Sequence, residues 1–274
     1  MAIVPSEGFQ FLESDYKGME VCIAACLSKD KSLIKYVSDP TTDMHRDTAR
    51  DIWMLAENDV TKMIRFYAKN MWVFAQFYGS YYVNCGNDLW EMRFEKTASG
   101  IPLHEHLKSK GIRNKNDFLS HLEAVEHEFW YNRFNDYRLW KEEENKKYLK
   151  LGYVELPFGF RRGGYCVPNQ VKNTPIQGTA FHCLLWTLMK VNKALRIRKM
   201  KSRIIWQIHD CTITNTYPSE LQEVIALIDN IGTKKLREVF PFLTVPLKID
   251  HEVGPIDGSW YEVEEMREQA QLVA

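Results

Sequence analysis

The chain has 274 residues, of which 45% are hydrophobic and 26% charged, as in an ordinary globular protein of one large or two small domains. Its 36 basic residues balance 36 acidic ones, so composition gives no support to nucleic-acid binding, which would have to rest on local patches. Neither a signal peptide nor an apolar run of about 18 residues is present. The six cysteines form no CxxC pair. We therefore expect a soluble, cytoplasmic protein with reduced thiols and no membrane partner.

The first half of the chain combines one predicted strand with several predicted helices. The strand is expected at 8–16, where GFQFLESDY alternates weakly and ends on an acid. Helices are expected at 18–28, 41–55 and 59–79, the second behind a Thr/Asp cap and the third closed by a glycine. Residues 80–115 look irregular, because glycine and proline punctuate them.

The second half of the chain contains most of the predicted strands. The expected elements are, in order, one or two charged helices at 116–152, a hairpin-like strand pair at 153–167, a helix at 174–200, strands at 203–209 and 211–216, a helix at 218–239 and a strand at 244–253. This pattern predicts an α+β fold, in which a helical insertion between residues 41 and 150 forms a second lobe on a sheet platform.

Two aspartates at strand ends are candidate metal ligands. Asp15 ends the first strand, and Asp210 lies in a turn within the apolar run IIWQIHDCTI. If both strands belong to one antiparallel sheet, the two carboxylates meet at its edge, where like charges repel unless a cation lies between them. Such a pair suits Mg²⁺, and two ions about 3.5–4 Å apart can promote an in-line displacement. Two independent turn aspartates remain the alternative, with His209 a core histidine.

The helix at 59–79 carries a second candidate group. Arg65 and Lys69 are four residues apart and share one face, and Phe74 and Tyr78 follow them. Two cations followed by two aromatic rings can hold a polyphosphate at one end and stack a base or sugar at the other. An ordinary amphipathic helix with a solvated basic edge would show the same residues.

In this order the motifs resemble those of the family A DNA polymerases, the bacterial DNA polymerase I family, and most of all its phage members. The blocks that carry the resemblance are DYKGMEVC (15–22) for motif A, Arg65, Lys69 and FAQFYG (74–79) for motif B, QIHDC (207–211) for motif C, and the further blocks GYVELPFGFRR (152–162), NTPIQGTA (173–180) and VPLKIDHEVG (245–254). The resemblance runs from the region of residue 10 to that of residue 260.

The resemblance implies an antiparallel-sheet palm with a large helical fingers insertion. The palm would comprise residues 1–40 and 151–274, and the fingers residues 41–150. The implied activity is template-directed DNA synthesis, in which two Mg²⁺ ions assist transfer of a nucleotide from a dNTP to the primer 3′-hydroxyl. Its partners would be primer-template DNA and dNTPs, in the host cytoplasm if the chain is phage-encoded.

The resemblance also implies a role for each matched residue. Asp15 and Asp210 would be the catalytic metal ligands, with the backbone carbonyl of Tyr16 as a third. Glu20, held by Tyr78, would exclude a ribose 2′-hydroxyl. The implied nucleotide-binding residues are Glu20, His45, Arg65, Lys69, Phe74 and Tyr78. The implied primer- and template-binding residues are Arg161, Asn173, Gln177 and His209.

The chain departs from the family pattern in each motif. Lys17 and Gly18 replace Ser and Gln in motif A, and Cys211 replaces the third acid of motif C. In motif B, Lys69 and Phe74 are five residues apart instead of four, which in an α-helix rotates Phe74 by about 100°. We predict a π-bulge between these two residues, because one extra residue in a wider turn restores the register.

The family places a thumb, the first palm strands and usually a 3′–5′ exonuclease before motif A, where this chain has only a few residues. We therefore expect the C-terminal half of a split polymerase, completed by an N-terminal partner that carries the thumb, with or without an exonuclease. A fragment is the alternative.

Three other functions stay open. They are a single-subunit RNA polymerase, a non-catalytic DNA-binding subunit with a decayed site, and a metal-dependent phosphohydrolase of the His-Asp type. Glu20 at the position that excludes ribose favours deoxynucleotides, whereas Cys211 leaves a decayed site open.

Overall fold

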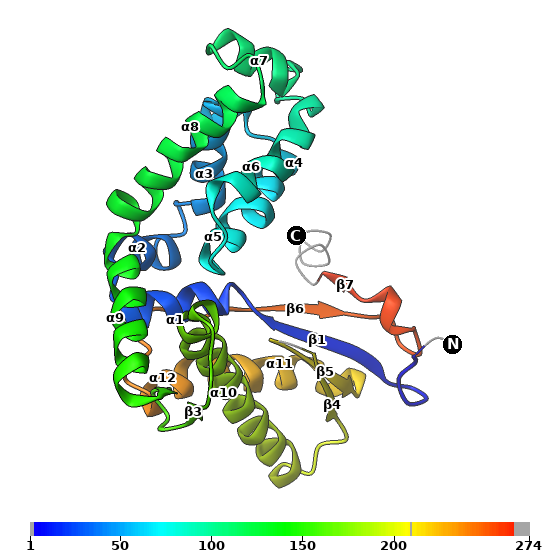
Figure 1. Cartoon of the computed structure of the whole chain (residues 1–274). Coiled ribbons are helices and arrows are strands. Elements are labelled where there is room, and N and C mark those ends of the chain that lie inside the picture. Colours follow the sequence, from blue (N-terminus) through cyan, green and yellow to red (C-terminus); the bar gives the residue numbers. More distant parts are fainter. Residues whose placement is uncertain (1–2, 209, 266–274) are drawn as a thin grey trace. The chain divides into compact units, whose positions relative to one another are not determined.

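The computed structural model of the chain describes residues 3–208 and 210–265 (Figure 1). The chain forms two compact units. Unit 1 consists of Met1–Leu27, Tyr153–Gly163 and Thr174–Ala274, and unit 2 consists of Ser28–Gly152 and Gly164–Asn173. Position 209, where the resemblance implies a primer-binding histidine, lies outside the described residues.

Unit 1 is built on an antiparallel sheet. Among the described residues the sheet has five strands in the order β4-β5-β1-β6-β7. The strands are β1 (Gln10–Tyr16), β4 (Arg203–Ile208), β5 (Cys211–Thr216), β6 (Ile249–Val253) and β7 (Glu264–Glu265). Strand β1 lies between β5 and β6 and pairs antiparallel with both. The prediction that the strands of Asp15 and Asp210 share one antiparallel sheet is confirmed, and the fold is α+β.

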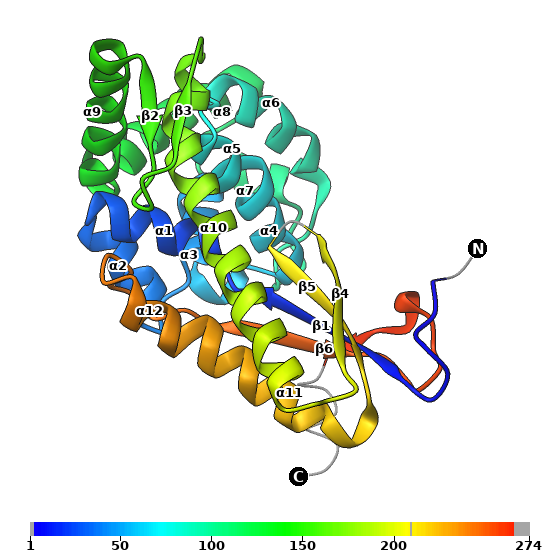
Figure 2. The same ribbon diagram turned by 90° about the horizontal axis from the view of Figure 1, so that it is seen from below.

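Helices cover one face of this sheet (Figure 2). They are α10 (Pro168–Ile197), whose first six residues belong to unit 2, α11 (Leu221–Asp229) and the π-helix η6 (Asn230–Lys235). The other helices of unit 1 are α1 (Met19–Ser28) and α12 (Leu236–Val239). Short 3₁₀ turns lie at η5 (Pro218–Glu220) and η7 (Trp260–Glu262), and β2 (Tyr153–Glu155) pairs with β3 (Arg161–Gly163).

Strand β1 has one face toward the core and one face away from it. Leu12 is fully buried and packs with Val191 of α10 and Val224 of α11. Because successive side chains of a strand alternate, Glu13 and Asp15 lie on the face opposite to Leu12. The carboxylates of the candidate site therefore lie on the face that these helices leave open.

Unit 2 is helical. Its elements are α2 (Lys31–Ser38), α3 (Met44–Trp53), η1 (Glu57–Asp59), α4 (Lys62–Tyr67), η2 (Ala68–Phe74), α5 (Ala75–Phe77), α6 (Tyr82–Glu91), η3 (Met92–Phe94), α7 (Leu103–Ser109), α8 (Lys115–His127), η4 (Glu128–Arg133) and α9 (Asn135–Leu151). Its largest fully buried side chains are Trp53, Trp72, Phe118, Phe129, Phe134 and Tyr137. In the part of the chain that the structure describes, no helix combines the length and apolarity needed to cross a membrane.

The expectation of an irregular segment at 80–115 is wrong, because helices α6 and α7 lie there. Gly86 lies inside α6, where a Cβ atom would come within 2.5 Å of Leu119 Cδ2 and 2.8 Å of Leu122 Cδ1. A glycine within a helix costs about 1 kcal/mol. Here it permits close packing of α6 against α8, which the local sequence does not reveal.

The first boundary between the two units falls between residues 27 and 28. Residues 28–40 belong to unit 2. The Asp30 carboxylate accepts a 3.0 Å hydrogen bond from the backbone N–H of Tyr137, and the Tyr36 hydroxyl donates to Asp47 over 2.8 Å. These long-range bonds attach helix α2 to the helices that follow it.

Candidate functional site

The end of strand β1 carries the first group of site residues. Asp15 pairs across the sheet with Cys211 on β5 and with Asp250 on β6. Asp210 immediately precedes β5 and is exposed in the turn between β4 and β5. The sheet register thus brings Asp15 and Asp210 to the same end of the sheet, as the sequence predicts.

The Asp15 carboxyl lies in a strongly acidic environment. Burial, followed by the charges of Asp210, Glu13, Asp250 and Glu252, raises its pKa to about 6. Its Oδ1 atom is buried and has no hydrogen-bond partner among the described residues. A buried carboxylate oxygen without a donor is destabilised unless a cation compensates it.

Asp15 and Asp210 have the chemistry that a divalent cation requires. Asp15 and Asp210 offer hard carboxylate oxygens, and one of them lacks a donor. No cluster of three or more His, Cys, Asp or Glu side chains able to hold a metal occurs within residues 3–208 and 210–265. A two-carboxylate site fits Mg²⁺, because this ion keeps several waters and takes further ligands from substrate phosphates.

Tyr16 anchors the end of β1 in the core of unit 1. Its hydroxyl donates to the carbonyl oxygen of Gly232 over 2.8 Å and lies 2.9 Å from Thr187 Oγ1. Burial raises the pKa of the Tyr16 phenol, so it stays neutral. The side chain thus fixes the end of the strand.

Cys211 occupies the position of the third acid of motif C and does not act as an acid. Its thiol is buried, and burial together with the charge of Glu13 and a hydrogen bond to it raises its pKa well above the ordinary range. Glu13 in turn accepts a 2.8 Å hydrogen bond from the Trp260 indole N–H. The thiol is therefore a neutral donor next to a carboxylate.

Unit 2 carries the second group, on the continuous segment α4–η2–α5. Residues Ala68–Phe74 form a π-helix, and the Lys69 ammonium lies 5.4 Å from the centre of the Phe74 ring. The predicted π-bulge between Lys69 and Phe74 is confirmed. The wider turn absorbs the extra residue and returns both side chains to one face.

His45 and Arg65 lie next to this segment. The Phe74 and His45 ring centres are 6.0 Å apart, and Arg65 Nε donates to Asp43 Oδ2 over 2.6 Å. Burial and the charges of Arg65 and Lys69 lower the pKa of His45 to about 4. His45 is therefore neutral at pH 7, and its buried Nδ1 has no partner among the described residues.

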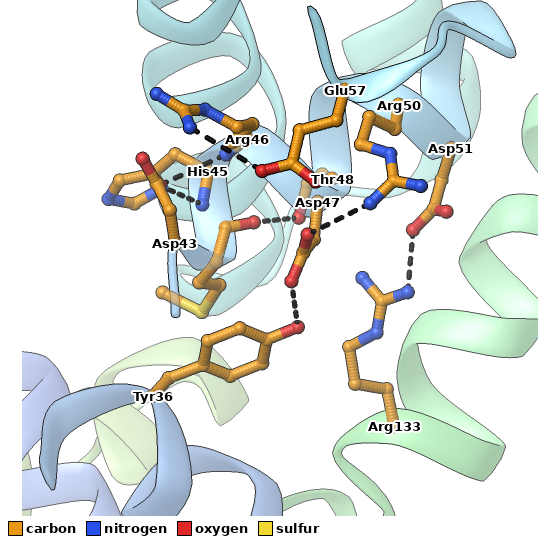
Figure 3. A network of polar contacts seen from close by, with 11 residues as sticks. Tyr36, Asp43, His45, Arg46, Asp47, Thr48, Arg50, Asp51, Glu57 and Arg133 are labelled. Carbon is orange, nitrogen blue, oxygen red and sulfur yellow. Dashed lines mark hydrogen bonds and ion pairs between the residues drawn. The ribbon is translucent and has the colours of Figure 1, made fainter. Parts of the chain in front are cut away.

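A polar network holds the helix that carries His45 (Figure 3). Asp43 caps α3, accepting 3.1 Å bonds from the backbone N–H groups of His45 and Arg46. Further along α3, Asp47 accepts from Tyr36 over 2.8 Å, and Asp51 forms a 2.6 Å ion pair with Arg133. These contacts join α3 to α2 and η4 and so fix the position of the imidazole.

The remaining predicted site residues lie on different elements of the two units. Tyr78 is 39% exposed, and its carbonyl oxygen accepts a 3.5 Å bond from Asn173 Nδ2. Gln177 is exposed on α10, and Arg161 on β3 forms a 2.9 Å ion pair with Glu155. Glu20 lies in the first turn of α1, in unit 1, whereas Tyr78 belongs to unit 2.

Sequence reasoning missed three residues that shape these groups. Asp43 is the partner of Arg65, Glu13 lies against Cys211, and the buried Lys141 ammonium donates to the carbonyl oxygen of Phe77 over 2.8 Å. For Glu13 a signal was available, because residues two apart on a strand share a face. Lys141 gave no signal, because the sequence around it is highly charged.

Known proteins resemble the chain over nearly its whole length. DNA polymerase I of Lactococcus lactis subsp. cremoris (strain MG1363) is 27% identical, with a match that covers 95% of this chain and 27% of that protein. DNA polymerase I of Bacillus subtilis (strain 168) is 26% identical with the same coverage. The thermostable DNA polymerase I of Thermus aquaticus is 26% identical, covering 92% and 27%. The chain thus spans about a quarter of the length of these relatives.

A solved structure shares the fold. It is the POL domain of Pol1 from M. smegmatis in complex with DNA primer-template and dNTP, with a TM-score of 0.67 and 22% identity over 94% of this chain and 41% of that one. The family model described as DNA polymerase family A matches residues 1–262. The chain therefore belongs to DNA polymerase family A.

Proposed function

We propose that this chain is the catalytic part of a template-directed DNA polymerase, which transfers a nucleotide from a dNTP to the 3′-hydroxyl of a DNA primer. The observation that carries the proposal is the buried Asp15 oxygen without a donor, at the sheet end that also bears Asp210, in a member of this family. The relatives named DNA polymerase I, and the DNA primer-template and dNTP of the solved neighbour, support these partners.

In this proposal unit 1 is the palm and unit 2 the fingers. Asp15, Asp210 and the backbone carbonyl of Tyr16 would hold two Mg²⁺ ions. When bound, such ions activate the attacking hydroxyl and stabilise the charge on the phosphate and leaving group. The two carboxylates contribute their negative charge and the fixed position given by β1 and the β4–β5 turn. A protonated Asp15 binds a cation poorly, so we expect metal binding to weaken below about pH 6.

The residues of unit 2 would receive the nucleotide. Arg65 uses Nε for its ion pair with Asp43, and its terminal nitrogens would contact a phosphate. Lys69 would add a second charge, and the neutral His45 would donate a hydrogen bond without adding charge. Phe74 would contact the sugar and base, and Glu20 with Tyr78 would exclude a ribose 2′-hydroxyl.

This chain would supply fewer contacts to DNA than to the metal ions and the nucleotide. Arg161, Asn173, Gln177 and His209 would touch the primer and the minor groove, where acceptors are similar for all base pairs. The formal net charge of zero means that no overall excess of cations holds the DNA backbone. We therefore propose that a thumb-bearing segment completes the enzyme, as in a split polymerase with an N-terminal partner chain.

Primer extension at low salt with Mg²⁺ tests the proposal. D15N and D210N are the altered chains, and D88N, at an exposed residue of α6, is the matched control. Deoxynucleotides and ribonucleotides are supplied in separate reactions, and Mg²⁺-dependent dNTP binding is measured in parallel. We expect extension with deoxynucleotides, lost in D15N and D210N and kept in D88N. A chain that neither extends a primer nor binds dNTP in the presence of Mg²⁺ would contradict the proposal and favour a non-catalytic DNA-binding subunit.

A further inference from the structure

Glu13 lies on the same face of the sheet as the candidate metal ligand Asp15. The two residues are two apart on β1, and side chains at that spacing point to the same face. Asp15 pairs with Cys211 on β5, and Glu13 pairs with the next residue of that face, Ile213. Cys211 is thus the diagonal neighbour of Glu13, a separation that a long side chain can span.

A donor from a distant segment holds the Glu13 carboxylate. The Trp260 indole N–H on η7 donates to its Oε2 atom over 2.8 Å, and the buried Cys211 thiol on β5, which donates to the carbonyl oxygen of Thr212 over 3.6 Å, lies next to the same side chain. The hydrogen bond from Trp260 restricts the rotation of the carboxylate. Its position is therefore set by the fold and not by solvent.

The Glu13 carboxylate lies next to Cys211 Sγ. The side chain of an acid at position 211 would extend beyond that atom. Position 211 is where the family motif has an acid, and its side chain here ends at Sγ, against Glu13. A glutamate at 211 would project its carboxylate beyond that atom, into the region that the Glu13 carboxylate borders. Glu13 is partly exposed and lines a hollow of about 510 Å³ together with Glu252 and Trp260, so its carboxylate is accessible to solvent.

We propose that Glu13 is a positioning carboxylate of the metal site, supplying from β1 the negative charge that an acid at position 211 would supply from β5. This inference rests on the proposed function, because it concerns the cation held by Asp15 and Asp210. With this charge supplied by Glu13, the metal site can be kept although motif C has the neutral thiol of Cys211. A third carboxylate near a divalent cation raises its affinity, and removing such an outer group typically weakens metal binding about 10- to 100-fold.

Metal binding measured without catalysis tests the role of Glu13. The probe is Mn²⁺ alone, titrated into the full chain, with free Mn²⁺ followed by electron paramagnetic resonance. E13Q keeps an oxygen that can accept from Trp260 but removes the charge. We expect E13Q to weaken Mn²⁺ binding about tenfold. E238Q, an exposed acid on α12, should leave binding unchanged, and circular dichroism should show all variants folded.

A second substitution asks whether Glu13 replaces the acid at 211. We expect C211E in the E13Q background to restore Mn²⁺ affinity to within a few-fold of the original chain. Loss of Mn²⁺ affinity in E13Q without recovery in the double variant would overturn the proposal that Glu13 takes the place of an acid at position 211.

The two proposals fail in different ways. If D210N weakens Mn²⁺ binding and E13Q does not, the role of Glu13 is overturned and the metal site stands. If neither substitution changes binding, the metal site itself is overturned, and with it the proposed function.

Discussion

At the scale of single residues, the site contains groups whose ionisation differs from that in water. Asp15 is protonated more readily than an ordinary aspartate, because burial and four neighbouring acids disfavour its charge. His45 is neutral at pH 7, because burial and two cations disfavour its charge. Each group lies where a ligand of opposite or complementary charge would relieve the disfavoured state.

The raised pKa of Asp15 predicts a pH dependence of stability in the absence of divalent cations. Between the ordinary value of 3.8 and about 6 the folded chain binds more protons here than the unfolded chain, so this group's contribution to stability falls as pH rises through that window. We expect D15N to remove that fall and to be more stable than the original chain at pH 8, by about 1 kcal/mol after allowance for solvent screening.

Urea unfolding of both chains at pH 4.5 and pH 8, with a chelator present, measures this difference. Added Mg²⁺ should stabilise the original chain and not D15N. Equal pH dependence in the two chains would contradict the prediction.

At the scale of single elements, the geometry of the candidate nucleotide-binding face of unit 2 depends on the π-helix η2. It brings Lys69 and Phe74 to one face although they are five residues apart. Immediately after it, the helix end at Phe77 is held by the Lys141 ammonium, which lies 4.4 Å from the ring centres of both Trp130 and Tyr137. One residue inserted into a helix and one buried amine thus set the geometry of the candidate nucleotide-binding face.

Deletion of Asn70, an exposed residue of η2, should convert the π-helix to an α-helix and preserve the register of Phe74. We expect stability unchanged to within about 1 kcal/mol and Mg²⁺-dependent dNTP binding retained. Insertion of an alanine after Asn70 should instead rotate Phe74 by about 100° and abolish dNTP binding. Thermal unfolding and dNTP titration of the two variants compare these outcomes; loss of binding in both would mean that the wide turn itself is required.

Lys141 predicts a second pH dependence, of opposite sign to that of Asp15. Burial and the charge of Lys172 lower its pKa to about 7, so between pH 7 and 10.5 the unfolded chain binds more protons here than the folded chain. Stability from this group therefore rises with pH across that window. We expect K141M to remove the rise, and K146M, an exposed neighbour on α9, to keep it. Urea unfolding at pH 6.5 and pH 9 would show a persistent rise in K141M if another group were responsible.

At the scale of the whole molecule, the formal net charge of zero limits the affinity for DNA that we expect of this chain alone. With 36 residues of each sign, the proposed DNA binding would depend on local cations. The chain aligns with about a quarter of the length of its relatives.

Binding of primer-template DNA to this chain should therefore be weak and sensitive to salt. We expect micromolar affinity near 50 mM salt and a loss of about tenfold or more by 200 mM, because each phosphate contact releases a counterion. Asn173 and Gln177 carry no charge, so the double alanine variant should weaken binding without changing the salt slope, whereas R161A should reduce the slope by about 1. Fluorescence anisotropy with a labelled duplex measures both quantities; an unchanged slope in R161A would place that residue away from the phosphates.

The sequence by itself determined the order of strands β1 to β6, the strand ends at Asp15 and Asp210, and the π-bulge, which follows from counting residues along one helix. It also carried the family motifs, because each motif is a short continuous stretch. Tertiary structure decided the rest, since it depends on residues far apart in the chain. Gly86 is helical only because α8 packs on it, and residues 28–40 join unit 2 through Asp30 and Tyr36. Glu13, Trp260 and Cys211 form one cluster only because sheet register and the turn η7 bring three distant segments together, and no local pattern encodes a register.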